Sequence, residues 1–175
     1  MNWSFGWPRT PPDCESWSRR PMTADSSRVD GVTDTYGVDL RAAVFDDAVD
    51  RLFRYDIFPP TLMRAHVCAT DGRVAPDAVV IQRVRIGFVV MEAAVRVIDV
   101  WRRDSEDAGF TYATLDGHPE RGVSRFRVVS DGSIVRFEIE AISRPGSILT
   151  SIARPFARRF QQSATRAALR HFASG

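Results

Sequence analysis

The sequence predicts an α+β fold in which a curved antiparallel sheet of about six to seven strands packs on a long C-terminal helix, with a shorter helix after the first strand. Residues 62–142 alternate apolar and polar side chains with the period of strands. Turn signals such as Asp71-Gly72 and Asp131-Gly132 join neighbouring strands, which favours an antiparallel meander. After Arg144-Pro145-Gly146 the apolar residues switch to the spacing of a helix.

Composition limits the domain count and the chemistry. A chain of 175 residues with 44% apolar residues is the size of one domain with a substantial core. The net charge of +2 is too small for a dedicated nucleic-acid-binding surface. All 24 basic residues are arginine, so a Schiff-base or lysine-nucleophile mechanism is excluded.

The two cysteines and the N-terminus indicate a cellular location. Cys14 and Cys68 lie far apart in dissimilar contexts, which predicts neither a disulfide framework nor a cysteine-rich zinc site. The chain has no continuous apolar segment of the kind found in signal peptides or membrane spans. We therefore expect a cytoplasmic protein in a reducing compartment.

The N-terminal part divides into an arm and the start of the domain. Prolines and serines without periodicity predict a poorly ordered arm over residues 1–29, followed by a single domain over residues 30–175. We expect a short strand over 30–38. Asp39 is a candidate helix cap, and the apolar stripe from Leu40 to Phe53 predicts a helix that ends before Pro59-Pro60.

The middle of the chain predicts the meander. On the longest strand, Val89, Met91 and Val95 fall on one face, whereas Glu92 and Arg96 fall on the other. On the first of these strands Arg64, His66 and Cys68 share the outer face, so His66 is expected to be a surface residue. The expected strands run over 62–69, 78–86, 88–101, 108–115, 123–129 and 134–142.

The C-terminal segment predicts the helix that covers the sheet. Its apolar residues from Ile148 to Phe172 follow i, i+4 spacing, and Ser147 is a candidate cap. Pro155 predicts a short opening turn and then a break before the main helix. The order strand, helix, meander, helix is that of the helix-grip fold, in which a cavity commonly remains between sheet and helix.

The loop 116–122 has more reactive side chains than a turn requires. It reads Asp-Gly-His-Pro-Glu-Arg-Gly and joins two predicted strands. Turn chemistry accounts for Asp116-Gly117 and Pro119, but it gains nothing from a histidine, a glutamate and an arginine beside them. The loop is therefore the main candidate for function, although a structural role as a rigid turn with a solvated Glu120-Arg121 pair stays open.

The segment 109–122, reading GFTYATLDGHPERG, with Ser143-Arg144-Pro145 and the arginine-rich helix over 155–172, resembles a bacterial and plant family catalogued as domain of unknown function nineteen-ninety. The resemblance covers residues 36–172. Val123 departs from the family pattern, which has an acidic residue there. The resemblance implies a helix-grip domain of START-like or Bet v-like architecture, and it implies no activity.

Ligand binding is the first hypothesis for function. The pattern predicts that a small apolar or amphipathic molecule binds between the sheet and the C-terminal helix. Whether the protein is also an enzyme stays open, and so does its oligomeric state. The predicted ligand-binding residues are Tyr112, Arg121, Phe110, Phe126, Phe156 and Phe160.

Acid/base catalysis is the alternative hypothesis, as a cyclase, an isomerase or a hydrolase. His118 would transfer the proton, since imidazole titrates near neutrality, and Glu120 or Asp116 would orient its ring. Tyr112 or Arg121 would polarise a carbonyl group of the substrate. No metal or other cofactor is expected, because a site on His118 lacks further ligands at metal-binding spacing and no glycine-rich phosphate loop is present.

An interaction surface is the third hypothesis. The last helix carries arginines opposite its apolar stripe, which could contact phosphates or anionic lipid headgroups. The small net charge favours a solvated face instead, and there is no strong nucleic-acid signal. These arginines are Arg154, Arg158, Arg159, Arg166 and Arg170.

Overall fold

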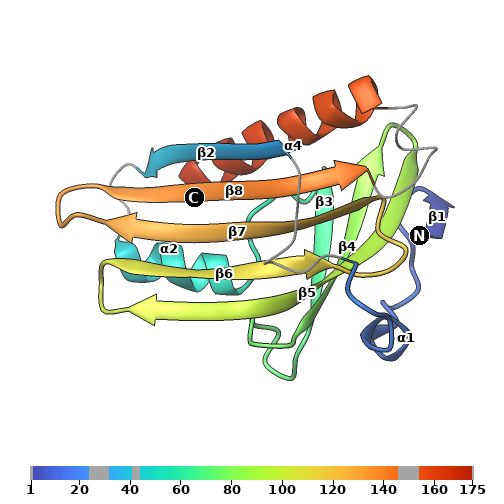
Figure 1. Ribbon diagram of the computed structural model, residues 1–175, viewed down its shortest axis with the longest axis horizontal. Helices are drawn as coiled ribbons and strands as arrows, with labels where there is room; N and C mark the ends of the chain where they lie inside the picture. Colours follow the sequence, from blue (N-terminus) through green and yellow to red (C-terminus); the bar gives the residue numbers. More distant parts are fainter. Residues whose placement is uncertain (1, 24–31, 41–43, 146–153, 175) are drawn as a thin grey trace.

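The computed structural model describes residues 2–23, 32–40, 44–145 and 154–174, with the backbone alone for 2–3, 32–33, 143–145 and 154–161. A curved antiparallel sheet forms one layer, and helices α2 and α4 lie against its concave face (Figure 1). The helices are α1 (Cys14–Ser18), α2 (Phe45–Phe53) and α4 (Arg154–Ser174). The strands are β1 (Asn2–Phe5), β2 (Val32–Leu40), β3 (Met63–Cys68), β4 (Val79–Ile86), β5 (Val89–Arg103), β6 (Asp107–Thr114), β7 (Glu120–Ser130) and β8 (Val135–Pro145).

The sheet has the predicted meander topology. Its order is β2-β8-β7-β6-β5-β4-β3, and β1 pairs separately with β5. The fold class predicted from the sequence is confirmed, and the eighth strand of the described sheet is β1. The register of β5 on β4 pairs Met91 with Val84 and Val95 with Val80, as the alternation on β5 requires.

Helix α2 begins later than predicted. Strand β2 pairs with β8 as far as Leu40, opposite Val135, so Asp39 lies in the ladder and does not cap a helix. The helix starts at Phe45, after Val44 in an extended conformation. In the sequence, Leu40 has the spacing of the apolar stripe of the helix, and this led us to start the helix too early. In the structure, Leu40 is the last residue of β2 and faces the core.

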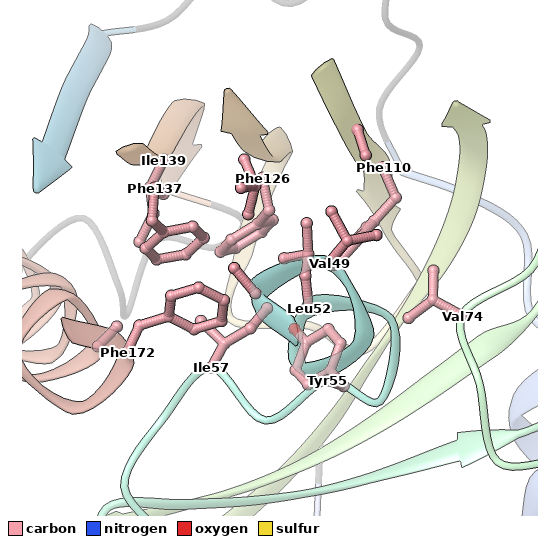
Figure 2. Packing of buried hydrophobic residues seen from close by; sticks show 14 of the residues in the cluster. Val49, Leu52, Tyr55, Ile57, Val74, Phe110, Phe126, Phe137, Ile139 and Phe172 are labelled. Atoms are coloured by element: carbon pink, nitrogen blue, oxygen red, sulfur yellow. The ribbon is translucent and has the colours of Figure 1, made fainter. Parts of the chain in front are cut away.

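The core lies between the concave face and the helices (Figure 2). Val49 and Leu52 of α2 are fully buried against it. Tyr55 follows α2 with a φ of 59°, a backbone conformation that residues other than glycine adopt only rarely. Its ring points into the core (Figure 2). Phe110 and Phe126 stack on neighbouring strands with ring centroids 5.3 Å apart.

The C-terminal end of α4 is fixed to both the sheet and α2. Phe172 stacks on Phe137 of β8 with ring centroids 4.1 Å apart. Arg51 of α2 donates a hydrogen bond of 2.9 Å to the carbonyl oxygen of Phe172, and its guanidinium group lies over the Phe172 ring. A cation at the C-terminal end of a helix also interacts favourably with the helix dipole. Side chains therefore fill the interior between the C-terminal end of α4, α2 and β8.

Helix α4 begins next to Pro155, where the sequence predicted the start of the main helix. Pro155 occupies the first turn of the helix, where a missing N–H costs little. The opening turn that we predicted from Ser147 lies outside the described residues.

The structure describes residues 2–23 of the N-terminal arm packed on the sheet, whereas the sequence led us to expect a poorly ordered segment. The arm crosses the outer face of β4 and β5, where Trp17 is 1% exposed and packs on Val79, Ile81 and Leu115. Thr23 donates a backbone hydrogen bond of 2.8 Å to Thr114 at the end of β6. A proline-rich chain has little propensity for regular secondary structure, but burial of the large Trp17 ring stabilises the arm on the sheet.

The arm is also linked covalently to the domain. Cys14 and Cys68 form a disulfide across a sequence separation of 54 residues, with Cα atoms 5.7 Å apart. The prediction of unpaired cysteines is wrong, because the distance between two cysteines in the sequence says nothing about where the arm crosses the sheet. In the chain-entropy model, closing a loop of this length stabilises a fold by about 4 kcal/mol. This disulfide gives no support to the reducing compartment that we expected from unpaired cysteines.

Within the described residues, none of the helices combines the length and the apolar character that crossing a bilayer requires.

Candidate functional site

The concave face carries a polar group of side chains in an otherwise apolar surface. Tyr112 of β6 pairs with Ser124 of β7, which pairs in turn with Ala141 of β8, so these three positions share one face of the sheet. Gln82 of β4 is 4% exposed and occupies the same inward-facing series as Val80 and Val84. A buried amide among valines is costly unless it is hydrogen-bonded.

Tyr55 provides that hydrogen bond. The Nε2 atom of Gln82 lies 2.6 Å from the hydroxyl oxygen of Tyr55 and donates to it. Burial raises the pKa of Tyr55 well above its usual value. Both residues come from segments that the sheet and α2 bring together, and the left-handed backbone at Tyr55 aims its hydroxyl at the inner wall.

Tyr112 extends the network toward the start of β7. Burial raises the pKa of Tyr112, although the polar side chains of Ser124, Gln82 and Tyr55 near its hydroxyl group oppose that shift. Both phenols are therefore neutral at physiological pH and can each donate or accept a hydrogen bond. A molecule that contacts this wall would meet two hydroxyl groups of fixed orientation.

Glu120 lies on the same face of β7 as Gly122 and Ser124. Burial raises the pKa of its carboxyl group. Its negative charge also contributes to the raised pKa of Tyr112. Among the described residues no arginine forms an ion pair with this carboxylate. A carboxyl group in such a setting can take up a proton more readily than an exposed glutamate.

His118 fixes the turn between β6 and β7. Its Nδ1 atom lies 3.1 Å from both the backbone nitrogen and the carbonyl oxygen of Glu120, so either tautomer makes a hydrogen bond there. The backbone N–H of His118 donates to the carbonyl oxygen of Leu115 over 3.0 Å. Burial lowers the pKa of His118 to about 4, so the ring is neutral at pH 7.

Asp116 and Arg121 lie away from this group. Asp116 is exposed, its backbone N–H donates to Pro21 of the arm over 2.9 Å, and its carbonyl oxygen accepts from Arg20. Arg121 is exposed and alternates with Glu120, so it belongs to the outer face of β7. Of the residues predicted to be catalytic, the structure brings His118 and Glu120 together through the backbone and leaves the Asp116 side chain in solvent.

The predicted aromatic wall is only partly described. Phe110 and Phe126 are 0% and 2% exposed and contact the Tyr55 ring, so they belong to the core beneath α2 (Figure 2). Phe156 and Phe160 lie in α4, but their side chains fall outside the described residues, and their role stays a prediction. Tyr55, Gln82 and Ser124 were not predicted. The one available signal was Gln82, a single amide in an inward-facing series of valines.

Two further groups of side chains lie elsewhere. Arg166 and Arg170 of α4 are exposed and line an open groove of about 410 Å³ beside Gly37 and Val38 of β2. The side chains of Arg154, Arg158 and Arg159 are outside the described residues. On the outer face, Cys14, His66 and Cys68 place their ligand atoms within 4.8 Å of one another. That cluster is separated from the concave wall by the sheet.

Comparisons with known proteins agree with this architecture. A family model described as "Domain of unknown function (DUF1990)" matches residues 16–171. No curated protein matches the chain.

Solved structures share the fold. A hypothetical protein from Helicobacter pylori is 12% identical with a TM-score of 0.59, over 99% of this chain and 96% of that chain. Ara h 8.0201 is 7% identical with a TM-score of 0.54, over 82% of this chain and 99% of that chain. A protein from Nitrosospira multiformis is 11% identical with a TM-score of 0.56, over 82% and 94%. These similarities and the strand order show a helix-grip fold.

Proposed function

The chain belongs to the DUF1990 family, and from that premise we propose that it binds a small amphipathic molecule between the concave face of the sheet and helix α4. Fold alone does not determine function, so the proposal depends on the wall residues. The observation that carries it is the buried hydrogen bond between Gln82 and Tyr55, with the Tyr112 hydroxyl nearby, on an otherwise apolar face. Ligand sites in proteins typically combine a mostly apolar lining with a few placed polar groups.

The proposed site occupies the half of the concave face that α2 does not cover. Near α2 the interior is filled by Phe126, Phe137 and Phe172. Toward the start of β7 the inward-facing positions are smaller or polar, with Ser124 between Tyr112 and Ala141. On β4 and β5, Val84 and Met91 supply an apolar surface that suits a hydrocarbon body.

The polar groups favour a neutral ligand headgroup. Tyr112 and Ser124 offer hydroxyls, and the carboxyl group of Glu120 has a raised pKa. An anionic headgroup would be repelled by ionised Glu120, whereas a ligand hydroxyl can bond to any of the three groups and a ligand carbonyl can accept from Tyr112 or Ser124. We therefore expect an uncharged alcohol, ketone or ester in preference to a fatty acid.

Native mass spectrometry of gently purified protein tests the proposal, together with thermal shifts against sterols, fatty alcohols, esters and fatty acids. We expect one bound molecule or a shift with a neutral amphiphile. Ser124→Leu fills the space between Tyr112 and Ala141 and should abolish the bound mass. Val123→Leu, the adjacent position on the outer face, is the matched control and should retain it.

Two results would overturn the proposal. The first is wild-type protein that shows neither a bound mass nor a thermal shift with any class of amphiphile. The second is Ser124→Leu that retains the ligand as tightly as Val123→Leu. Circular dichroism of both variants separates loss of the ligand from loss of the fold.

If the same site catalyses a reaction, Glu120 is a better candidate for the acid than His118. The Nδ1 atom of His118 is engaged by the Glu120 backbone, and a pKa of about 4 leaves the ring unprotonated at pH 7. Glu120, with its raised pKa, meets the requirement that a general acid titrates near the working pH more closely. Turnover of a bound ester or epoxide that Glu120→Gln abolishes, with binding retained, would establish this second function.

A further inference from the structure

A second cluster of reactive side chains lies on the outer face, where the arm meets β3. His66 and Cys68 are two residues apart on β3, so their side chains share one face. Cys14 reaches the same point from α1, and the ligand atoms of all three lie within 4.8 Å of one another. The path of the arm across the outer face, and not a sequence motif, brings this set together.

The residue types match a metal that prefers sulfur and nitrogen. Two thiolates and one imidazole are ligands that zinc accepts at tetrahedral sites, where water can fill a fourth position. His66 is exposed, and no described residue hydrogen-bonds its ring, so a ring nitrogen is free to coordinate. The disulfide already holds the backbones of both cysteines close, with Cα atoms 5.7 Å apart.

The local charge permits a cation. Arg64 and Arg83 line a hollow of about 170 Å³ beside His66, and unbalanced arginines would oppose metal binding. However, Arg83 is paired with Glu92 over 2.7 Å, and the Arg64 guanidinium group lies over the Trp7 ring. Two thiolates also balance the charge of a divalent ion, so the site would be neutral when filled.

We propose that, once the disulfide is reduced, Cys14, His66 and Cys68 bind one zinc ion that holds the arm on the sheet. A dithiol reductant supplies two electrons and two protons, the S–S bond breaks into two thiols, and the reductant becomes a disulfide. Zinc then displaces both thiol protons to solvent, and neutral imidazole completes the protein ligands. The arm is thereby fastened covalently under oxidising conditions and by metal under reducing conditions.

The proposal is independent of the ligand site on the concave face. The family model begins at residue 16, so Cys14 lies just before the matched region and the metal site is argued from this chain's own residues. The disulfide and the metal need the same sulfur atoms, so they exclude each other. Oxidised protein should therefore bind no zinc at this point.

Cobalt titration of the whole reduced chain tests the site. Protein is reduced with dithiothreitol, desalted under argon and titrated with Co²⁺, whose thiolate complexes absorb through charge transfer. We expect one equivalent to bind and zinc to displace it. His66→Ala should weaken binding at least about tenfold, since even outer partners of metal ligands change affinity by roughly 10- to 100-fold. His171→Ala removes a distant histidine and is the control, and Cys14→Ser should remove most of the absorption.

Alkylation provides a second readout that does not depend on cobalt. Zinc should slow the reaction of iodoacetamide with both Cys14 and Cys68 in the reduced chain, as followed by mass spectrometry. If the reduced chain loses the arm or unfolds by circular dichroism, zinc should restore it. The proposal is wrong if reduced protein binds no metal, if zinc neither protects the thiols nor restores the fold, or if His66→Ala binds as tightly as His171→Ala.

Discussion

The indole nitrogen of Trp17 donates a hydrogen bond of 3.2 Å to Glu92, and this bond ties the arm to the middle of β5. The other carboxylate oxygen of Glu92 accepts from Arg83 over 2.7 Å. Trp17 is buried against Val79 and Ile81 of β4, Ala94 of β5 and Leu115, which follows β6. The arm is therefore part of the folding unit, with a small core of its own on the outer face.

Truncation of this ring should be among the most damaging substitutions in the chain. Trp17→Ala should lower the free energy of unfolding by about 3–5 kcal/mol, because loss of a large buried side chain leaves a cavity and Glu92 loses one of its two hydrogen-bond donors. Urea denaturation measures the effect. Trp7→Ala is the control, since Trp7 is partly exposed and stacks on Arg64, and it should cost less than half as much. Equal losses would show that the arm is not anchored at Trp17.

Ion pairs of arginine should contribute more to the free energy of unfolding when they are buried than when they are exposed. The side chains of Arg83 and Glu92 are each 12% exposed, so Arg83→Met leaves a buried carboxylate with only the indole donor and should cost about 3–5 kcal/mol. Arg102 and Asp46 are 49% and 64% exposed, and Arg102→Met should cost at most about 1 kcal/mol. Denaturation at low and high salt should change only the second pair appreciably. A salt-sensitive Arg83 pair would contradict its burial.

Glu120 should make the fold more stable at acid than at neutral pH. Its folded pKa is raised above the ordinary 4.5, so the folded state binds its proton more readily, and this stabilising contribution is lost as pH rises through the raised pKa. Glu120→Gln removes the charge. The variant should be more stable than wild type at pH 7, and the difference should shrink as pH falls through the raised pKa and become small below 4.5. Urea midpoints across this range test it, and a constant difference would contradict the buried carboxyl group.

His118 should act in the opposite direction. Its folded pKa of about 4 lies below the ordinary 6.5, so its contribution to stability is fully present above pH 6.5 and is lost as pH falls toward 4. The loss is on the order of 3 kcal/mol. His118→Asn keeps an acceptor for the Glu120 amide but does not titrate in this range. Wild type should therefore lose more stability than the variant between pH 6.5 and 4, and parallel curves would contradict a buried neutral ring.

The central sheet could be predicted from sequence because its physical cause is local. The alternation of apolar and polar residues along 89–97 places Met91 and Val95 on the inner face, independently of which strands lie beside this one. Asp131-Gly132 marks the turn of the β7–β8 hairpin. The order of the helices around the meander then leaves few architectures. Fold class, strand faces and the outer position of His66 were all accessible in this way.

The candidate site could not be predicted to the same extent. The bond between Gln82 and Tyr55 joins residues 27 positions apart and depends on the left-handed backbone at Tyr55, which no propensity favours. The disulfide and the burial of Trp17 likewise depend on where the arm returns across the sheet. The loop at His118 drew attention by composition, but its side chain is used to hold the turn.

The pairing of Trp17 with the outer residues of the sheet has an evolutionary consequence. Val79, Ile81, Ala94 and Leu115 pack against the ring and would be more exposed to water without it, so we expect them to be apolar in homologues that keep an aromatic anchor in the arm. Substitutions at these four positions should therefore covary with the residue type at position 17 in an alignment of homologues. A homologue that has lost the anchor should carry polar or charged residues there, and grafting this arm onto it should fail until they are changed back.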